Sequence, residues 1–375
     1  MSITKVVLTG GPCAGKSTAL ATIQARFSAQ GYKVFVAPEA ATEMISGMGI
    51  SPFMLTASSD KWNYLFQQLM AQLQIGKENI IDCAAQSYLR DNPDGKVLVV
   101  CDRGLMDQAA YLPMEQLATV LASIEVTPDK ALARYDGVIH LVSAAIGAEA
   151  AYNHGNAARS ETVEQAAELD RRTLAAWIGH PHLRVIDNST DFESKIERVI
   201  REISDILGEL VPTEREYKYL IEAVDEKTLL AAGAVRSTIV QVYLRPTPET
   251  DERRIRQRCV YGESSLYYTE KRATGKRGER IEVERRITLT EYMRLLAEAD
   301  PTARPIVKTR YCFVYKNQYF ELDVYEGDLV GEGKAILEIE LSQNTDEVEI
   351  PGWIRVVRDV TDDVSFRNAA LARNH

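Results

Sequence analysis

Short apolar runs alternate with helix-like stretches along the first half of the chain. A short apolar run between turn residues predicts a buried strand, and apolar residues that recur every three or four positions predict an amphipathic helix. We expect strands at 5–9, 33–37, 97–101, 138–142 and 183–186, and helices at 17–30, 60–90, 113–124, 157–178 and 191–209. This order is typical of an α/β fold with a parallel sheet and helices on both of its faces.

Beyond about residue 211, charged and apolar residues alternate one by one, for example in 214–218, 238–244, 254–258 and 321–325. Because successive side chains of a strand point to opposite faces, this pattern predicts an antiparallel sheet with one charged and one apolar face. The density of charge also rises, from 43 charged residues in the first 211 to 55 in the remaining 164. We therefore expect two domains, residues 1–211 and 212–375.

The composition is that of a folded globular protein. Of the 375 residues, 45% are hydrophobic and 26% are charged, which excludes collagen-like and disordered chains. The five cysteines are scattered without a CxxC pair, which argues against a disulfide framework or a zinc ribbon and favours a reducing compartment. Neither a membrane span nor a signal-peptide pattern is present, so we expect a cytoplasmic protein. The net charge of −10 argues against a general nucleic-acid coat, and we expect no DNA partner.

The segment after the first expected strand matches the pattern GxxxxGK[ST]. It consists of Gly10, Gly11, Pro12, Cys13, Ala14, Gly15, Lys16 and Ser17, and Thr18 continues it into the first expected helix. A glycine-rich turn between a strand and a helix places backbone N–H groups and a helix N-terminus around an anion. In such a loop the lysine neutralises the β- and γ-phosphates of a nucleotide, and the serine hydroxyl ligates Mg²⁺. We therefore expect a P-loop NTPase domain that binds ATP or GTP.

Residues out to about 209 resemble the P-loop kinases that include thymidylate kinases, deoxynucleoside kinases and the kinase domain of NadR-type regulators, more than motor ATPases or switch GTPases. The likeness rests on the loop above, on Glu39 after the second strand, and on Asp102 and Arg103 at the end of the third strand. It implies that Lys16 and these three residues are catalytic. Glu39 would touch the acceptor hydroxyl or the metal, Asp102 would lie on the Mg²⁺ side, and Arg103 would face the substrate.

The same resemblance implies an arginine-bearing lid after the fourth strand, at Arg159, Arg171 or Arg172, and a contact between Asn188 and the nucleotide base. An arginine in the lid stabilises charge on the transferring phosphoryl group. Two plainer interpretations stay open, since Glu39 can be an ordinary residue at a helix start and each arginine can lie on a solvated helix face. The phosphoryl acceptor, if there is one, is also open, because no motif points to one substrate.

Seven segments of the second half carry charged or polar residues at every second position. The segments contain Glu214, Glu216 and Lys218; Arg254, Arg256 and Arg258; Thr269 and Lys271; Arg280, Glu282 and Glu284; Lys308 and Arg310; Glu321 and Asp323; and Glu338 and Glu340. The opposite faces are apolar or aromatic, which predicts a closed antiparallel barrel with a charged lumen. Cations in such a lumen neutralise a polyanionic ligand, and carboxylates hold Mg²⁺ or Mn²⁺ that bridges its phosphates.

This arrangement resembles the CYTH domain of the triphosphate tunnel metalloenzymes, whose ExExK hallmark is met by Glu214, Glu216 and Lys218. The resemblance implies an α+β domain with an eight-stranded tunnel that turns over inorganic triphosphate, an organic triphosphate or polyphosphate. Lys218 would polarise the attacked phosphoryl group or orient water. The expected phosphate ligands are Arg254, Arg256, Arg258, Lys271, Lys308 and Arg310, and the expected metal ligands are Glu214, Glu216, Glu282, Glu284, Asp323, Glu338 and Glu340, beside Ser17 and Asp102 in the first domain.

Two functions remain open from the sequence. The first is a bifunctional phosphate enzyme, in which a P-loop kinase or NTPase is fused to a Mg²⁺- or Mn²⁺-dependent triphosphatase. The second is a regulatory protein with a nucleotide switch, whose tunnel binds polyphosphate or a phosphoinositide headgroup without turnover; the order of the two domains is similar to the family that includes the TRPL translocation defect protein. The carboxylates favour catalysis, because a protein that only binds polyanions needs cations more than acids.

Overall fold

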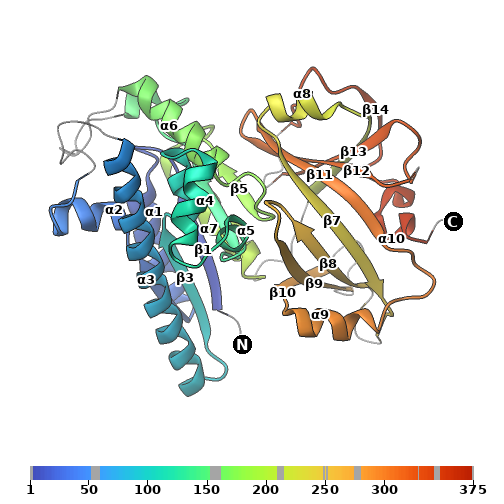
Figure 1. Cartoon of the computed structure of the whole chain (residues 1–375), viewed down its shortest axis with the longest axis horizontal. Coiled ribbons are helices and arrows are strands. Elements are labelled where there is room, and N and C mark those ends of the chain that lie inside the picture. Colours follow the sequence, from blue (N-terminus) through green and yellow to red (C-terminus); the bar gives the residue numbers. More distant parts are fainter. Residues whose placement is uncertain are drawn as a thin grey trace. The chain divides into compact units, whose positions relative to one another are not determined.

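The computed structural model describes residues 3–51, 60–152, 162–208, 215–247, 250, 252–273, 280–327, 329–341 and 347–373. The chain divides into two compact units, Met1–Ile206 and Leu207–His375, called here the N-terminal and the C-terminal unit (Figure 1). The domain boundary expected at about residue 211 lies outside the described residues. No helix in the described part of the chain has both the length and the apolar character needed to cross a bilayer.

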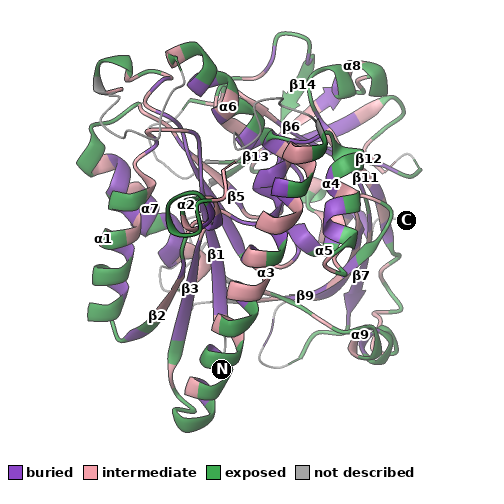
Figure 2. Ribbon diagram, turned by 60° about the vertical axis from the view of Figure 1, so that its left-hand side comes forward, coloured by how far each residue is buried: buried purple, intermediate pink, exposed green. Residues whose placement is uncertain are grey.

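The N-terminal unit contains a five-stranded parallel sheet, as predicted. Its strands are β1 (Ile3–Thr9), β2 (Tyr32–Ala37), β3 (Lys96–Asp102), β4 (Gly137–Leu141) and β5 (Leu183–Ile186), in the spatial order β2-β3-β1-β4-β5. The central strands β1 and β3 are largely buried (Figure 2) and form the core, in which Val6, Val7 and Val100 have no exposed surface. Parallel pairing places Leu8 beside Asp102, so the carboxyl ends of β1 and β3 lie at the same edge of the sheet.

Helices join these strands. They are α1 (Lys16–Ala29), α2 (Ala40–Thr42), α3 (Asp60–Asp91), α4 (Met114–Ala122), α5 (Pro128–Leu132), α6 (Val163–Ala175) and α7 (Phe192–Ile206), with a π-helical turn at Glu43–Gly47 and 3₁₀ turns at Leu105–Ala110 and Glu149–Ala151. All five expected helices are present. Helix α6 begins later than expected because Thr162 caps it: the Thr162 hydroxyl accepts a hydrogen bond from the backbone N–H of Gln165.

The C-terminal unit contains one antiparallel sheet of nine strands, and the prediction of a closed eight-stranded barrel is wrong. The spatial order is β10-β9-β8-β7-β11-β12-β13-β6-β14, and within the described residues the edge strands β10 and β14 do not pair. The strands are β6 (Arg215–Glu222), β7 (Val235–Leu244), β8 (Glu252–Cys259), β9 (Ser264–Ala273), β10 (Arg280–Arg286), β11 (Ile306–Tyr315), β12 (Gln318–Tyr325), β13 (Lys334–Leu341) and β14 (Val356–Asp359). The short strand β14 pairs with the outer edge of β6, so this edge is not available for the pairing with β10 that would close a barrel.

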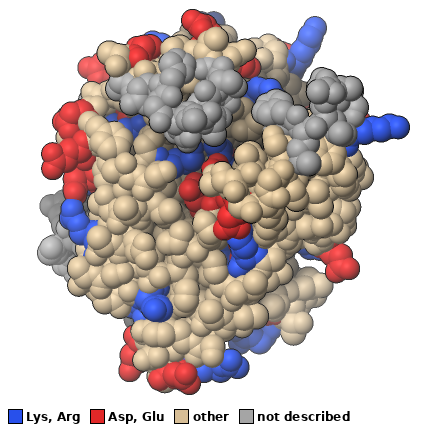
Figure 3. Space-filling model, turned by 90° about the vertical axis from the view of Figure 1, so that its left-hand side faces the viewer, with Lys and Arg blue, Asp and Glu red and all other residues tan. Residues whose placement is uncertain are grey.

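The apolar face of this sheet carries the main core of the unit. Phe313 and Phe320 stack there with ring centroids 5.4 Å apart, and Leu322 and Leu337 pack beside them without exposure. Three short helices complete the unit: α8 (Glu226–Ala231), α9 (Leu289–Leu296) and α10 (Asn368–Leu371), with a 3₁₀ turn at Val364–Phe366. Figure 3 looks onto the left-hand side of Figure 1, and there acidic and basic side chains are interspersed among uncharged areas. The other face of the sheet holds the charged residues described below.

Candidate functional site

The glycine-rich loop lies between β1 and α1, and none of its three glycines has room for a side chain. Gly10 (φ 140°) and Gly15 (φ 92°) have backbone conformations that favour glycine. A Cβ on Gly10 would lie 2.1 Å from the backbone oxygen of Leu141, and one on Gly15 would lie 2.6 Å from the Phe192 ring. The packing of the sheet and α7 therefore fixes the course of the loop.

The side chain of Lys16 folds back over this loop. Its Nζ donates hydrogen bonds to the backbone oxygens of Gly10, at 3.0 Å, and Gly11, at 3.1 Å. Burial, followed by the positive charge of Arg103, lowers the pKa of Lys16 to about 8. The ammonium group is thus poorly compensated, and a phosphate anion would stabilise it.

Glu39 and Arg103 form an ion pair at the same sheet edge. Arg103 Nε donates to Glu39 Oε1 at 2.6 Å, and Thr42 Oγ1 donates to Glu39 Oε2 at 2.6 Å. Burial acts to raise the pKa of Glu39, but Arg103 and the Thr42 hydroxyl lower it to about 2. Arg103 has a positive φ of 68°, and its Nη1 lies 3.7 Å from Asp107 Oδ1. The guanidinium is therefore held between two carboxylates.

Asp102 ends β3 and has a buried carboxylate oxygen, Oδ1, without a hydrogen-bond partner among the described residues. Burial raises the pKa of Asp102. Ser17, the second residue of α1, is exposed. A free carboxylate oxygen and a serine hydroxyl beside a phosphate loop fit Mg²⁺, which takes few protein ligands and completes its shell with phosphate oxygens and water. These two residues would hold the ion.

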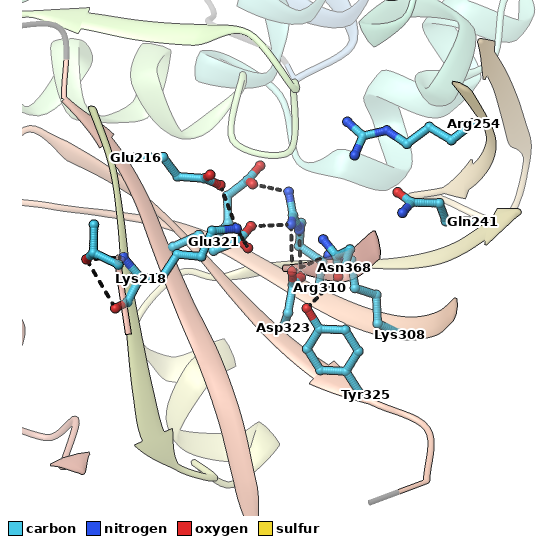
Figure 4. Close-up of polar contacts among 12 residues, drawn as sticks. Glu216, Lys218, Gln241, Arg254, Lys308, Arg310, Glu321, Asp323, Tyr325 and Asn368 are labelled. Atoms are coloured by element: carbon cyan, nitrogen blue, oxygen red, sulfur yellow. Dashed lines mark hydrogen bonds and ion pairs between the residues drawn. The ribbon is translucent and has the colours of Figure 1, made fainter. Parts of the chain in front are cut away.

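In the C-terminal unit, the register of the strands brings the predicted charged residues to one face. Arg310 of β11 pairs with Asp323 of β12, and Glu338 of β13 pairs with Lys218 of β6. Figure 4 shows several of these side chains pointing toward one another from neighbouring strands. Charged members of this face that are at most one-tenth exposed are Lys218, Arg254, Arg258, Lys308, Arg310, Asp323 and Glu338.

Arg310 lies at the centre of an ion-pair network. Its Nε and Nη2 bind both oxygens of Asp323, at 2.7 and 2.6 Å, and Nη2 also lies 2.8 Å from Glu338 Oε2. Lys308 donates to Asp323, and Lys218 Nζ donates to Glu338 Oε1 at 2.7 Å. Although burial acts to raise their pKa values, these cations lower the pKa of Asp323 and hold that of Glu338 well below its usual range.

Arginines of β8 line the other part of the charged face. Arg256 Nη1 lies 3.5 Å from Glu284 Oε2, and Arg254 Nη1 lies 3.7 Å from Glu252 Oε1. Arg258 differs, because the residue is only 5% exposed and its guanidinium forms no ion pair with any described carboxylate. Its Nη2 lies 3.9 Å from Cys312 Sγ, and its buried Nε has no partner among the described residues.

Several carboxylates that were expected to bind metal in this unit form ion pairs with lysine and arginine. Glu216 lies 3.1 Å from Lys218 Nζ, and Asp323 and Glu338 are bonded to the cations above. Among the described residues, no three His, Cys, Asp or Glu side chains form a group that could hold a metal ion. The described carboxylates therefore do not fit a resident metal in this arrangement. Glu214 and the side chain of Glu282 lie outside the described residues.

Comparison with protein-family models gives a match over residues 5–195, more than half of the chain, to the family described as an AAA domain. The chain belongs to the AAA domain family. The N-terminal unit thus contains an AAA-type P-loop NTPase domain, as the glycine-rich loop predicted. The finer likeness to nucleotide kinases stays a prediction.

Among solved structures, two of a protein called NE1496 match this chain, one of them titled as an inorganic triphosphatase. They are 25% identical to it, with TM-scores of 0.30 and 0.31, and cover 43% and 44% of this chain and 99% and 96% of their own. A third, PH1819 from Pyrococcus horikoshii OT3, is 25% identical with a TM-score of 0.27, and covers 35% of this chain and 81% of its own. TM-scores this low support no inference about the present chain. The search of curated proteins found no match.

Two further residues that the sequence predicted for the nucleotide site, Asn188 and Arg171, have hydrogen-bond or ion-pair partners within the AAA domain. The amide of Asn188 donates to the backbone oxygens of Ser143 and Ile146, at 2.8 and 2.7 Å, and accepts from Lys195 at 2.7 Å. The Asn188 side chain therefore forms hydrogen bonds that connect neighbouring segments of the domain. Arg171 pairs with exposed Glu168 at 2.9 Å, which supports the plainer interpretation for that arginine, and Arg159 lies outside the described residues.

The sequence interpretation also missed residues of the AAA domain that touch the site. Asp107 accepts a hydrogen bond from the backbone N–H of Gly104 at 2.7 Å and also contacts Arg103. Asp170 of α6 contacts the glycine-rich loop itself at Gly11. The burial of Asp170 could have been predicted from helix periodicity, because Asp170 lies on the helix face that also carries the buried Ala166, Ala167, Thr173 and Leu174.

Proposed function

We propose that this chain is a bifunctional phosphate enzyme. Its AAA domain binds ATP or GTP with Mg²⁺ and transfers or hydrolyses the γ-phosphoryl group, and its C-terminal unit binds and hydrolyses a linear triphosphate. The observation that carries the first half is the gathering of Lys16, Glu39, Asp102 and Arg103 at the carboxyl ends of β1, β2 and β3. In open parallel sheets this edge is where ligands bind.

In the AAA domain, backbone N–H groups of residues 13–17 and the N-terminus of α1 hold the phosphates. The ammonium of Lys16 neutralises phosphate charge, and its protonated form, with a pKa of about 8, predominates at neutral pH. When bound between Ser17 and Asp102, Mg²⁺ supplies further positive charge to the phosphates. Glu39 remains ionised and positions the acceptor hydroxyl or water, while Arg103 orients Glu39 and faces the transferred group.

In the C-terminal unit, Arg258 is the observation that supports anion binding. A buried guanidinium without a carboxylate partner is costly, and a phosphate with its bidentate oxygens removes that cost. Arg254 and Arg256 lie on the same strand face and extend the site along β8. We propose Lys218, which pairs with Glu216 and Glu338, as the residue that polarises the phosphoryl group. The CYTH resemblance implies that hydrolysis depends on Mg²⁺ or Mn²⁺, although the described carboxylates form no site for a resident ion, and this dependence is tested below.

The ion-pair network favours a second candidate for the C-terminal unit. Asp323 and Glu338 each bind two cations, so these carboxylates serve as counter-ions in the structure. A unit built in this way can bind polyphosphate or a phosphoinositide headgroup without turnover, with the AAA domain acting as a nucleotide switch.

The test uses the full chain and measures phosphate release from ATP, GTP and inorganic triphosphate with Mg²⁺ or Mn²⁺. Lys16→Ala should abolish nucleotide turnover and leave triphosphate hydrolysis intact, and Arg258→Ala should do the reverse. Lys33→Ala and Arg236→Ala are matched controls, because both side chains are exposed. If nucleotide turnover survives Lys16→Ala, the first half of the proposal is wrong. If triphosphate binds in an Arg258-dependent manner but no divalent ion supports hydrolysis, the binding candidate replaces the enzyme.

A further inference from the structure

Asp170 connects helix α6 to the glycine-rich loop. Its Oδ1 accepts two backbone hydrogen bonds, from Gly11 N–H at 2.7 Å and from Ser143 N–H at 3.0 Å. Its Oδ2 lies 3.3 Å from Nε2 of His140 on β4. The Asp170 side chain is 2% exposed. One buried carboxylate thus joins the phosphate loop, the segment after β4 and α6.

Ser143 holds the same loop from a second side. Its hydroxyl donates to the backbone oxygen of Pro12, and the N–H of Ala144 donates to the backbone oxygen of Cys13 at 3.3 Å. The loop residues that precede Lys16 are therefore fixed by hydrogen bonds to residues distant in sequence, and Asp170 is the ionised group among them. Although burial acts to raise its pKa, the hydrogen bonds from His140 and from the two N–H groups lower the pKa of Asp170.

The fit between Gly11 and Asp170 is close. A Cβ on Gly11 would lie 2.7 Å from both Cβ and Oδ1 of Asp170, closer than real Cβ contacts come. Gly11 does not have a positive φ, so glycine is required at this position by the contact with Asp170 and not by the backbone conformation. Only a glycine at position 11 therefore leaves room for this contact between the loop and α6.

We propose that Asp170 is a positioning residue for the phosphate-binding loop, and that through it the docking of α6 and the binding of nucleotide phosphates stabilise each other. This rests on the proposed nucleotide binding at the loop. If Asp170 is removed, the Gly11 and Ser143 N–H groups lose a buried charged acceptor, and the loop can leave the conformation that receives phosphate. Because coupling between two equilibria is reciprocal, nucleotide must stabilise the α6 contact by as much as that contact strengthens nucleotide binding.

The reciprocal effect separates this role from a merely structural one. A structural residue lowers stability when removed but leaves the nucleotide affinity of the folded protein unchanged. For a positioning residue, Asp170→Ala should weaken nucleotide binding about ten- to a hundredfold. In the wild type, nucleotide should slow hydrogen exchange at the amides of α6, and in Asp170→Ala this slowing should disappear.

The experiment compares full-length variants by calorimetric titration with ATP and GTP and by hydrogen exchange. Asp170→Asn keeps one oxygen that can accept both N–H groups, so it should retain most of the affinity that Asp170→Ala loses. Glu168→Ala, which changes an exposed residue of the same helix, should bind nucleotide as the wild type does. If Asp170→Ala does not fold, Gly11→Ala tests the same contact from the loop side and should reduce both affinity and α6 protection.

Two failures can be told apart. If the wild type binds no nucleotide, or if Lys16→Ala binds as well as the wild type, the proposed function is wrong. If the wild type binds in a Lys16-dependent manner, but Asp170→Ala or Gly11→Ala keeps the wild-type affinity and the nucleotide-dependent protection of α6, the positioning role of Asp170 is wrong.

Discussion

Replacing Asp323 with Asn tests whether ion pairs hold the charged face of the C-terminal unit together. Asp323 is fully buried and accepts hydrogen bonds from Lys308 and from two nitrogens of Arg310. Asn has nearly the same size, but it has no charge, and one of its two polar atoms donates. The variant therefore turns a hydrogen bond into a contact between two donors and leaves two buried cations with one counter-ion fewer.

The expected loss follows from this geometry. Removing one partner of a buried ion pair costs about 3–5 kcal/mol. For a unit of this size, each kcal/mol lowers the melting temperature by about 2–4 °C, so the C-terminal unit should melt about 6–20 °C lower. Inorganic triphosphate should restore more stability to this variant than to the wild type, because its negative charge replaces that of Asp323.

Pulsed hydrogen exchange along a temperature ramp measures the loss in each unit of the full chain. Peptides from β11 and β12 should report the lower midpoint, and peptides from β1 and β3 should not shift. Glu349→Gln is the matched control, because it removes one charge from an exposed pair with Lys316. A shift below about 2 °C in β11 and β12 would refute the reasoning, since that corresponds to at most about 1 kcal/mol.

Three further predictions concern charge and chemistry. The pKa of Glu338 is lower in the folded state than in the unfolded state. Ionised Glu338 therefore stabilises the fold above the pKa of the unfolded state, near pH 4, and this stabilisation is lost as the pH falls through the pKa of the folded state. The free energy of unfolding of Glu338→Gln should thus depend less on pH in acid. Nucleotide binding uses protonated Lys16, so affinity should fall as pH rises above about 8, and Lys16→Arg should flatten that dependence in calorimetric titrations. Glu39→Gln should lower kcat more than nucleotide affinity in steady-state assays, because Glu39 acts on the acceptor or water, and an equal loss of both would reassign it to structure.

The parallel sheet could be predicted because its central strands β1, β3 and β4 are buried on both faces. Strands β1 and β3 contain uninterrupted apolar runs, at 6–8 and 97–101, that can be recognised without knowledge of a distant partner. The 3₁₀ turn Leu105–Ala110 could not be predicted in this way. It is held by Asp107, which binds Gly104 N–H and the hydroxyl of Thr9, a residue far away in the sequence.

The charged face shows where alternation stops being informative. The period of two correctly places Lys218 and Glu338 on a charged face, but it does not say that the two strands are neighbours in register. Strand register is set by tertiary contacts. It brings Glu338, a carboxylate expected to bind metal, next to a lysine and an arginine, with which it forms ion pairs. Closure of the sheet is likewise invisible in the pattern, because the short strand β14 carries no alternating signal and yet occupies the edge of β6.

Asp170 suggests a more general use of helix periodicity in finding functional residues. The arginines that follow it in the sequence drew attention because they are charged, but Arg171 is exposed, whereas Asp170 falls on the apolar stripe of α6. A carboxylate on such a stripe must find donors inside the protein, since burying it without them is too costly. Near a phosphate-binding loop, the abundant unpaired donors are the backbone N–H groups of the loop itself. A buried acid on a helix that packs against such a loop is therefore a better candidate for controlling its shape than an exposed arginine one residue away.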